Sequence, residues 1–406
     1  GSMEKIILVG ASLNSGNRGV NALTRSMIML ILNKYGNNSK ITILSYTVKE
    51  TVENKIYFED KEIIVEEKLC TRKNMIKTYL LSNIGVENEL SKMIKDSDQI
   101  WDISEGDSFS DIYGIGRLIQ HSLIKLISIK LRKNLVIMPQ TIGPFNKKIS
   151  KVIAKKIINK ANIVFVRDDI SKKVLQDDLR IKRKINVSPD MAFYMEPKKD
   201  ASIDKFINEN DKIKVGINIS ALLYNGGYNG KNMFGLKADY SKVIRCIIET
   251  FSEKKNVEII LIPHVMVESM EVEDDFRTCN RIADEFRKNK NINIHTLDKY
   301  YREDELKSII SGCDFFVGSR MHACIGAIST HVPTVPIAYS RKFIGIWDKI
   351  GLGYCVTDPR KQSEDEIISS ILENFNNSKK IKEKLDLEIP LLEKQIEKIV
   401  DIIEEN

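Results

Sequence analysis

Short apolar runs alternate with longer amphipathic segments through the first half of the chain. The segment Lys5–Val9 is an almost unbroken apolar run, which is typical of a parallel strand buried on both faces. After a loop rich in Gly and Asn, apolar side chains recur with the helical period of about 3.6 residues. The strand pattern returns at residues 41–44, 98–103, 134–138 and 162–166, with helices predicted at 114–132 and 146–160. This alternation predicts βαβ units and a parallel sheet.

The alternation stops between Glu196 and Lys212, where the sequence is polar and contains a proline. It then resumes, with strands predicted at 215–219, 257–262, 292–297, 315–319 and 334–339. We therefore expect a Rossmann-like domain over residues 3–195, a linker over 196–212, a second Rossmann-like domain over 213–360 and charged helices over 361–406. The predicted fold is α/β, with the two domains facing a cleft. Ligands of such sheets bind at the carboxyl ends of strands, so the cleft is the expected active site.

Composition narrows the classes of function. The 406 residues are 42% hydrophobic, and 63 Lys and Arg against 56 Asp and Glu give a net charge of +7 that is spread along the chain. Because no basic stripe with interleaved aromatic residues occurs, nucleic acid is not an expected partner. The six cysteines form no C-x-x-C pair, and the acidic pairs lack partners at ligand spacing. No metal site is therefore predicted.

The chain shows no signal peptide before its first strand, and its apolar stretches are shorter than the ~20 residues that span a bilayer. We therefore expect a cytoplasmic protein. The charged amphipathic helices near the end of the chain leave peripheral contact with the inner face of the membrane open. The oligomeric state is not predicted.

The most informative segment lies between residues 315 and 343. A predicted strand ends at Val317, Gly318-Ser319 turn the chain, and a helix follows, with Ser319 as its predicted N-cap. A helix N-terminus offers free N–H groups and the positive end of the helix dipole. Arg320 and His322 flank this point. An arginine fork, an imidazole and a helix start together suit a dianionic ligand that carries phosphate or carboxylate.

The next predicted strand ends at Tyr339 and is followed by a second basic group, Arg341 and Lys342. If the two strands are neighbours in the sheet, the two loops meet at one edge. Taken singly, Arg320 would more often form a surface ion pair and His322 would more often be a satisfied core histidine. Their joint placement in one strand-to-helix turn favours a functional role.

The string SRMHACIGAIS, followed by VPTVPIAYSRK, resembles the C-terminal signature of the polysaccharide pyruvyl transferase family. The matching positions are Ser319, Arg320, His322, Tyr339 and Lys342. Weaker similarities occur in the loop that holds Asn17 and Arg18, in the turn PQTIGP at 139–144 and in the I-P-H segment that ends at His264. The sequence departs from the family at Val20, where an acidic residue is usual. The resemblance implies a glycosyltransferase-B-like fold.

The resemblance also implies an activity. A pyruvyl group would move from phosphoenolpyruvate to a sugar of a cell-surface polysaccharide precursor, forming a pyruvate ketal and releasing phosphate. Phosphoenolpyruvate would be a co-substrate, and no cofactor is expected. Arg320 and Lys342 would hold the anionic groups of the donor, His322 would act as the acid, and Asp107 or, second, Asp111 would act as the base. The further substrate-binding candidates are Ser319, Arg341, Tyr339, His264, Asn17 and Arg18.

Two other functions remain open. A nucleotide-sugar glycosyltransferase of the same build would need an acidic residue for the ribose in the C-terminal half. A non-catalytic glycan-binding protein is disfavoured by Arg320, His322 and Lys342, because binding alone rarely needs an imidazole beside an anion site. The linkage of the acceptor sugar, to lipid, nucleotide or polymer, is also open. His121, between apolar residues on a helix face, is predicted to be structural, and His295, inside a strand pattern, is predicted to be a core residue.

Overall fold

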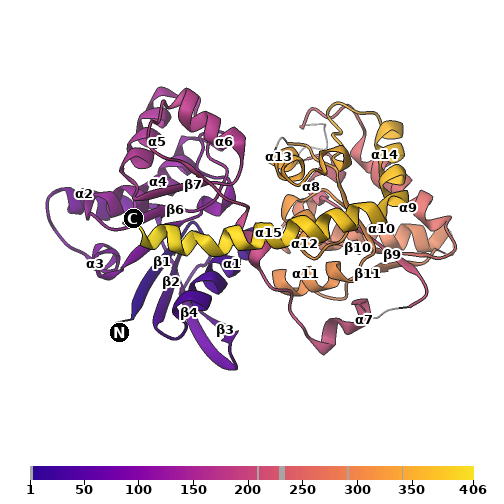
Figure 1. Ribbon diagram of the computed structural model, residues 1–406, viewed down its shortest axis with the longest axis horizontal. Helices are drawn as coiled ribbons and strands as arrows, with labels where there is room; N and C mark the ends of the chain where they lie inside the picture. Colours follow the sequence, from indigo (N-terminus) through magenta and orange to yellow (C-terminus); the bar gives the residue numbers. More distant parts are fainter. Residues whose placement is uncertain (1–2, 208–209, 228–233, 290–291, 341) are drawn as a thin grey trace. The chain divides into compact units, whose positions relative to one another are not determined.

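The chain divides into two units (Figure 1). The computed structural model describes residues 3–207, 210–227, 234–289, 292–340 and 342–406. The N-terminal unit contains residues 1–15, 23–194 and 393–406, and the C-terminal unit contains residues 16–22 and 195–392. The polypeptide thus enters the second unit briefly at residues 16–22 before it completes the first. It returns to the first unit in the second half of its last helix.

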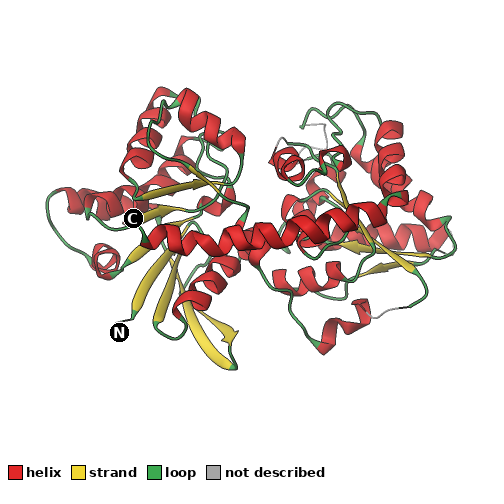
Figure 2. Cartoon of the chain, viewed as in Figure 1, coloured by secondary structure: helices red, strands yellow, loops and turns green. Residues whose placement is uncertain are grey.

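The N-terminal unit is built on an eight-stranded sheet in the order β3-β4-β2-β1-β5-β6-β7-β8 (Figure 2). Its strands are β1 (Glu4–Val9), β2 (Ser39–Ser45), β3 (Val52–Phe58), β4 (Lys61–Leu69), β5 (Gln99–Asp102), β6 (Leu135–Ile137), β7 (Ile163–Val166) and β8 (Asn186–Val187). All neighbouring strands are parallel except β3 and β4. Its helices are α1 (Arg18–Tyr35, beginning in the C-terminal unit), α2 (Arg72–Asn83), α3 (Glu89–Asp96), α4 (Ile115–Lys130), α5 (Lys148–Lys160) and α6 (Asp169–Lys173).

The C-terminal unit is built on a five-stranded parallel sheet in the order β11-β10-β9-β12-β13. Its strands are β9 (Ile213–Asn218), β10 (Val257–Ile262), β11 (Ile294–Thr296), β12 (Phe315–Gly318) and β13 (Thr334–Pro336). Its helices are α7 (Asp204–Ile207), α8 (Ala221–Tyr224), α9 (Tyr240–Ser252), α10 (Asp275–Asn289), α11 (Glu303–Ser311), α12 (Met321–Ser329), α13 (Lys342–Lys349), α14 (Glu364–Asn376) and α15 (Ser378–Glu404, ending in the N-terminal unit). The predicted alternation of strands and helices in both halves is confirmed.

Each sheet is buried on both faces, which explains the continuous apolar runs in the sequence. Ile7 and Leu8 point to opposite sides of β1, and both are buried. In the second sheet, Val215 and Ile217 on β9 pack in the core with Phe251 and Phe315. Burial of these side chains supplies the main driving force for folding of each unit.

The hairpin formed by β3 and β4 was not predicted. Its strands are only partly buried, so charged residues interrupt their apolar pattern. Its turn holds Glu59 and Asp60 with φ of 48° and 64°, in the left-handed region that such turns require. Because the usual Asn-Gly signal of this turn is absent, the sequence gives no clear sign of the hairpin.

In each sheet the strand order reverses at one position. The reversal lies between β1 and β5 in the first sheet and between β9 and β12 in the second. The loops that leave two such strands turn to opposite faces, so a crevice opens at their carboxyl ends where ligands bind in folds of this class. The loops after β1, β5, β9 and β12 are therefore the places to search for a site.

A buried ion pair fixes the loop after β5. Asp102 ends this strand, and its carboxylate lies 3.2 Å from the Nζ of Lys125 on α4, with both side chains fully buried. Lys125 also donates a hydrogen bond of 2.8 Å to the Ser104 hydroxyl, which donates to Asp102. The pair thus joins the strand, its loop and the helix that follows.

We predict that Lys125→Met lowers the free energy of unfolding by about 3–5 kcal/mol, because it leaves the Asp102 carboxylate buried without its cation. Chemical denaturation monitored by circular dichroism measures this change. The double variant Lys125→Met/Asp102→Asn should recover part of the loss, since no full charge stays buried. Lys130→Met, at the exposed end of the same helix, is the matched control and should unfold as the wild type does. Equal stability of Lys125→Met and Lys130→Met would contradict this role.

Candidate active site

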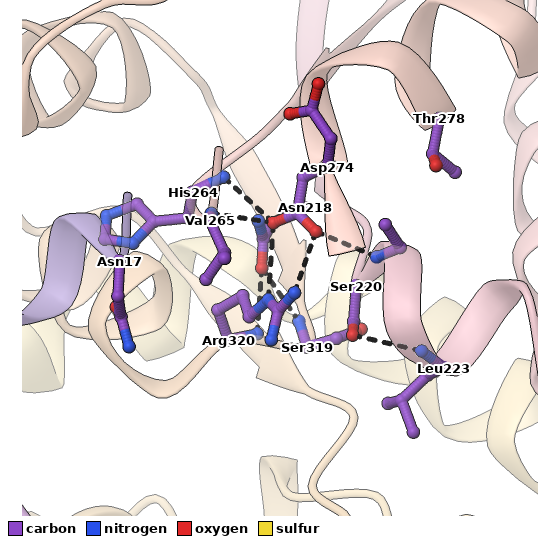
Figure 3. A network of polar contacts seen from close by, with 12 residues as sticks. Asn17, Asn218, Ser220, Leu223, His264, Val265, Asp274, Thr278, Ser319 and Arg320 are labelled. Carbon is purple, nitrogen blue, oxygen red and sulfur yellow. Dashed lines mark hydrogen bonds and ion pairs between the residues drawn. The ribbon is translucent and has the colours of Figure 1, made fainter. Parts of the chain in front are cut away.

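The polar cluster of the C-terminal unit begins with Asn218, the last residue of β9 (Figure 3). Its fully buried side-chain oxygen accepts hydrogen bonds from the backbone N–H groups of Ser319 (3.1 Å) and Arg320 (2.8 Å). Its amide group donates to the carbonyl oxygen of Ile262 at the end of β10 (2.9 Å). One amide side chain therefore holds together the ends of three neighbouring strands, at the position where the strand order reverses.

Asp275, the first residue of α10, is the second organising group. Its buried carboxylate accepts backbone N–H bonds from Ala221 (2.8 Å), His264 (3.1 Å) and Val265 (2.8 Å). It also takes both Nε (3.3 Å) and Nη2 (2.8 Å) of Arg320 in a bidentate ion pair. Burial alone would lower the pKa of Arg320, but the Asp275 charge raises it above its ordinary value. The guanidinium is thus permanently charged, and its side chain keeps 16% of its surface exposed.

Ser319 plays a different part from the one predicted. The prediction that it caps α12 is wrong by one residue, because the N-cap position is occupied by Arg320. The Ser319 hydroxyl is instead hydrogen-bonded to the hydroxyl of Tyr240, which also accepts the backbone N–H of Ser220 (3.0 Å). Because Ser319 is fully buried, its contact with Tyr240 stabilises the loop from the interior of the unit.

Residues 16–18, at the end of the loop that follows β1 and the start of α1, form part of this cluster. The backbone N–H of Arg18 donates to the carbonyl oxygen of His264 (3.1 Å), and that of Met266 donates to Gly16 (2.8 Å). Asn17 and Val265 form an antiparallel bridge between these two bonds. The structure thus brings Asn17 and Arg18 to the I-P-H segment. The close approach requires glycine, since a Cβ at Gly16 would lie 2.5 Å from the carbonyl oxygen of Met266.

Two histidines lie beside the arginines. Burial lowers the pKa of His264 well below 6.5, and the nearby charges of His322, Arg18 and Arg320 lower it further, so its imidazole is neutral near pH 7. In the described part of the chain, no group hydrogen-bonds to this ring, which extends towards Asn17 in Figure 3. The ring of His322 packs against Gly19, where a Cβ would lie 2.6 Å from its Nδ1.

The second basic group lies at the end of β13. The ring of Tyr339 is half-buried and its centroid lies 5.8 Å from that of Phe234. Lys342 is half-buried and begins α13. Arg341 lies outside the described residues. Since β12 and β13 are parallel neighbours, the two predicted loops do leave the same edge of the sheet.

The two predicted bases lie in the loop after β5, in the N-terminal unit. One carboxylate oxygen of Asp111 accepts the backbone N–H groups of Asn146 (2.7 Å) and Lys147 (2.8 Å), just before α5. Burial would raise the pKa of Asp111, but these bonds bring it below its ordinary value. This geometry favours a capping role for Asp111 over that of a base. Asp107 is half-buried and accepts a hydrogen bond from the hydroxyl of Tyr113 (3.0 Å).

Glu105, which no sequence pattern singles out, lies in the same loop. Its carboxylate pairs with Arg117 and lies 3.7 Å from Nε2 of His121, whose side chain is buried. Burial raises the pKa of Glu105, and Asp107 adds to this effect while Arg117 opposes it. Ser104 and Glu105 have φ of 44° and 51°, a conformation that costs energy outside glycine and is concentrated at functional sites. The sequence offers no sign of this conformation.

The remaining histidines lie apart from these clusters. The prediction that His295 is a core residue is wrong, because 52% of its side chain is exposed and it lies 3.5 Å from Glu258. His331 follows α12 and pairs with Asp386. Across the described ranges, no three His, Cys, Asp or Glu side chains gather as a metal site would require.

The buried histidines give stability a defined pH dependence. Because the pKa of His264 is lowered in the folded protein, the unfolded chain binds its proton first as the pH falls below about 6.5. The stability that each such histidine contributes is therefore present above that pH and is lost progressively as the pH falls below it. His121, whose pKa burial also lowers, should contribute in the same direction.

We predict that His264→Gln removes part of the loss in unfolding free energy between pH 7.5 and 5.5, because the buried neutral imidazole is gone. Denaturant titrations at both pH values measure the loss. His295→Gln, a change at a half-exposed histidine of the same unit, should leave it as in the wild type. An unchanged pH dependence in His264→Gln would contradict the neutral, buried state of this ring.

Comparison with known proteins places this geometry in a family. The family model for polysaccharide pyruvyl transferase matches residues 7–341. The amylovoran biosynthesis protein AmsJ of Erwinia amylovora is 21% identical over 400 residues, which cover 94% of each chain. Within the described residues, no helix has the length and apolar character needed to cross a membrane.

Solved structures share the fold at low sequence identity. The α,α-trehalose-phosphate synthase (UDP-forming) of Burkholderia vietnamiensis aligns with a TM-score of 0.58 and 9% identity, covering 100% of this chain and 99% of that one. The UDP-GlcNAc 2-epimerase of Neisseria meningitidis aligns with a TM-score of 0.56 and 12% identity, covering 99% and 100%. These likenesses confirm two Rossmann-like domains of the glycosyltransferase-B type. The match over most of its length shows that this chain is a transferase of polysaccharide biosynthesis that belongs to the polysaccharide pyruvyl transferase family.

Proposed function

We propose that the protein transfers a pyruvyl group from phosphoenolpyruvate to a sugar of a cell-surface polysaccharide precursor, forming a pyruvate ketal and releasing phosphate. The observation that carries this proposal is the convergence of Arg18, Arg320, His264 and His322 at the carboxyl edge of the second sheet. The donor bears a carboxylate and a phosphate, and both groups need charged, directional N–H donors. Membership in the family supports the same donor.

Arg320 is suited to orient such a donor. Asp275 engages Nε and one N–H of Nη2, which leaves three of the five N–H donors of the guanidinium for a ligand. Asp275 also accepts hydrogen bonds from three backbone N–H groups, so groups of the protein itself satisfy its carboxylate. Arg18, which also donates from Nε to the carbonyl oxygen of Tyr301 (3.0 Å), brings a second guanidinium to the same edge. We propose that these two arginines hold the carboxylate and the phosphate, with Lys342 and Tyr339 completing the pocket.

The reaction requires balanced proton transfers. Protonation converts the methylene group of the donor into a methyl group and leaves an oxocarbenium-like carbon. One sugar hydroxyl then attacks this carbon. The C–O bond to phosphate then breaks, and the second hydroxyl closes the ketal. The two sugar hydroxyls lose two protons in total. The net result is that one proton ends on the new methyl group and the other on the departing phosphate. We propose His322 as the acid for the donor and His264, neutral and beside it, as the group that relays protons.

The acceptor hydroxyls need a base, and we propose that it is a carboxylate of the loop after β5. Asp107 and Glu105 share the loop after β5, and Glu105 combines a raised pKa with contact to His121. A carboxylate with a raised pKa is a stronger base than an ordinary one, and the paired guanidinium of Arg117 favours its ionised form. Glu105 therefore joins Asp107 as a candidate for this role.

The activity test is phosphate release from phosphoenolpyruvate in the presence of lipid-linked and nucleotide-linked sugars. We expect release that depends on both donor and acceptor, with a product that carries a pyruvate ketal by mass spectrometry. A parallel arm supplies UDP-sugars without phosphoenolpyruvate. Sugar transfer in that arm alone would assign the protein to the glycosyltransferases, and binding without turnover in either arm would leave a glycan-binding protein.

We predict that Arg320→Lys weakens phosphoenolpyruvate binding by roughly 10- to 100-fold, because an ammonium group keeps the charge near Asp275 but loses the planar fork. Calorimetric titration measures the affinity. Arg277→Lys is the matched control, since Arg277 pairs with Asp274 near the same helix start but its side chain is 37% exposed. Donor affinity that is unchanged in Arg320→Lys would exclude Arg320 from the donor site.

We predict that His322→Gln lowers turnover by roughly 10²–10⁴-fold while donor affinity changes little, as expected when a proton donor is lost. Steady-state kinetics and a melting curve are measured together. His331→Gln, at the opposite end of α12, is the matched control and should retain wild-type turnover. A lowered melting temperature with normal specific activity of the folded fraction would show that His322 is structural instead.

A further inference from the structure

The helical layer formed by α2, α4 and α5 has an unusual charge. These helices pack side by side on the N-terminal unit, with α4 between the other two (Figure 1). They contain eleven Lys and Arg over 41 residues and no Asp or Glu. The whole chain has 63 basic and 56 acidic residues, so the rest of it holds 52 and 56. Two of the eleven, Arg117 and Lys125 on α4, pair with Glu105 and Asp102, which leaves a surplus of nine positive charges in the layer. Although basic residues are spread along the sequence, the surplus of positive charge in the folded protein is therefore concentrated in this layer.

The same layer exposes aliphatic side chains. On α2, Ile76, Leu80 and Ile84 follow one another at intervals of four residues, from the helix into the residue after it, and Ile84 is 72% exposed. On α5, Ile149 and Val152 lie on the solvent side, with Val152 68% exposed. Exposed lysines surround this second pair, namely Lys148, Lys151, Lys155 and Lys156. Isolated exposed apolar residues are ordinary, but two aliphatic groups within one basic layer call for an explanation.

We propose that the outer surface of α2, α4 and α5, here called the basic face, binds the surface of a membrane that contains anionic lipids. Lysines would lie against the lipid headgroups while the aliphatic side chains enter the boundary with the acyl chains. Because no helix in the described residues can cross a bilayer, this attachment is peripheral. The two acidic side chains of the neighbouring helix α3, Glu89 and Asp96, are matched in number by Lys92 and Lys95.

The composition of the basic face favours lipid over nucleic acid. Single-stranded nucleic acid is bound through aromatic rings that stack on bases, and the exposed residues of these three fully described helices include no aromatic side chain. Aliphatic groups gain nothing from a phosphate backbone but gain free energy from leaving water at a lipid interface. The proposal is independent of the identity of the donor or acceptor.

The test is flotation of the full chain with vesicles. We expect little binding to neutral phosphatidylcholine and at least tenfold stronger partition into vesicles with roughly a third phosphatidylglycerol at low salt. Each basic residue near an anionic surface strengthens partition roughly fivefold. Raising the salt to about 0.5 M should weaken binding, since the charges are exposed and screened.

Paired variants locate the surface. Lys155→Gln/Lys156→Gln should lower partition roughly 10- to 30-fold, whereas Lys394→Gln/Lys398→Gln, at exposed lysines of α15 in the same unit, should not. Ile149→Ser/Val152→Ser should lower it roughly tenfold. The control Leu387→Ser/Leu391→Ser changes comparably exposed side chains of α15 and should have no effect. Melting curves verify that each variant is folded.

Three outcomes would overturn the proposal. The first is equal binding to neutral and anionic vesicles, or binding to neither. The second is a loss of partition in the α15 controls as large as that in the α5 variants. The third is tight binding of an RNA or DNA oligomer that excludes the vesicles, which would assign the basic face to nucleic acid.

Discussion

The buried carboxylate of Asp275 is the constraint on which the rest of the candidate site depends. A buried charge is costly unless it is paired and its remaining oxygen lone pairs are satisfied. Asp275 meets this requirement with backbone N–H groups of the loops after β9 and β10 and with the guanidinium of Arg320 after β12. The carboxylate therefore ties these three loops to one another. The same bonds that stabilise the unit therefore fix the direction of Arg320.

Close backbone contacts extend this arrangement of loops to the segment at residues 16–19. The loop that Asp275 holds at His264 and Val265 is the one that pairs with residues 16–18. The absence of a side chain at Gly16 and Gly19 lets the first segment reach the carbonyl oxygen of Met266 and the ring of His322. A substituent at either position would displace one of these groups. The placement of His264 and His322 thus depends on two glycines as much as on any polar contact.

Much of this could be predicted from the sequence, because continuous apolar runs reveal buried parallel strands and residues after such strands lie at one edge. Arg320, His322, Lys342 and His264 could be expected in segments that follow strands, and the structure has them there. Asp275 could not be identified as a partner of Arg320, since the pairing joins a helix start to a loop 45 residues later. Nor could Glu105 be singled out, since its position depends on a left-handed backbone that only the fold imposes. Long-range pairing and local strain leave no periodic pattern in a sequence.

The departure at Val20 bears on where the proposed base is found. The family usually has an acidic residue there, whereas this chain has a valine that is 7% exposed. A buried valine cannot accept a proton. If the acidic residue usual at this position serves as a base in the family, another carboxylate must take that role in this chain, or the role is absent. Asp111 is committed to the start of α5, which leaves Asp107 and Glu105 in the loop after β5. Of these two, Glu105 has the feature that a base near neutrality needs, because burial raises its pKa while Arg117 limits the rise. The strained turn that holds Glu105 is then understandable as the cost of keeping this carboxylate partly out of water.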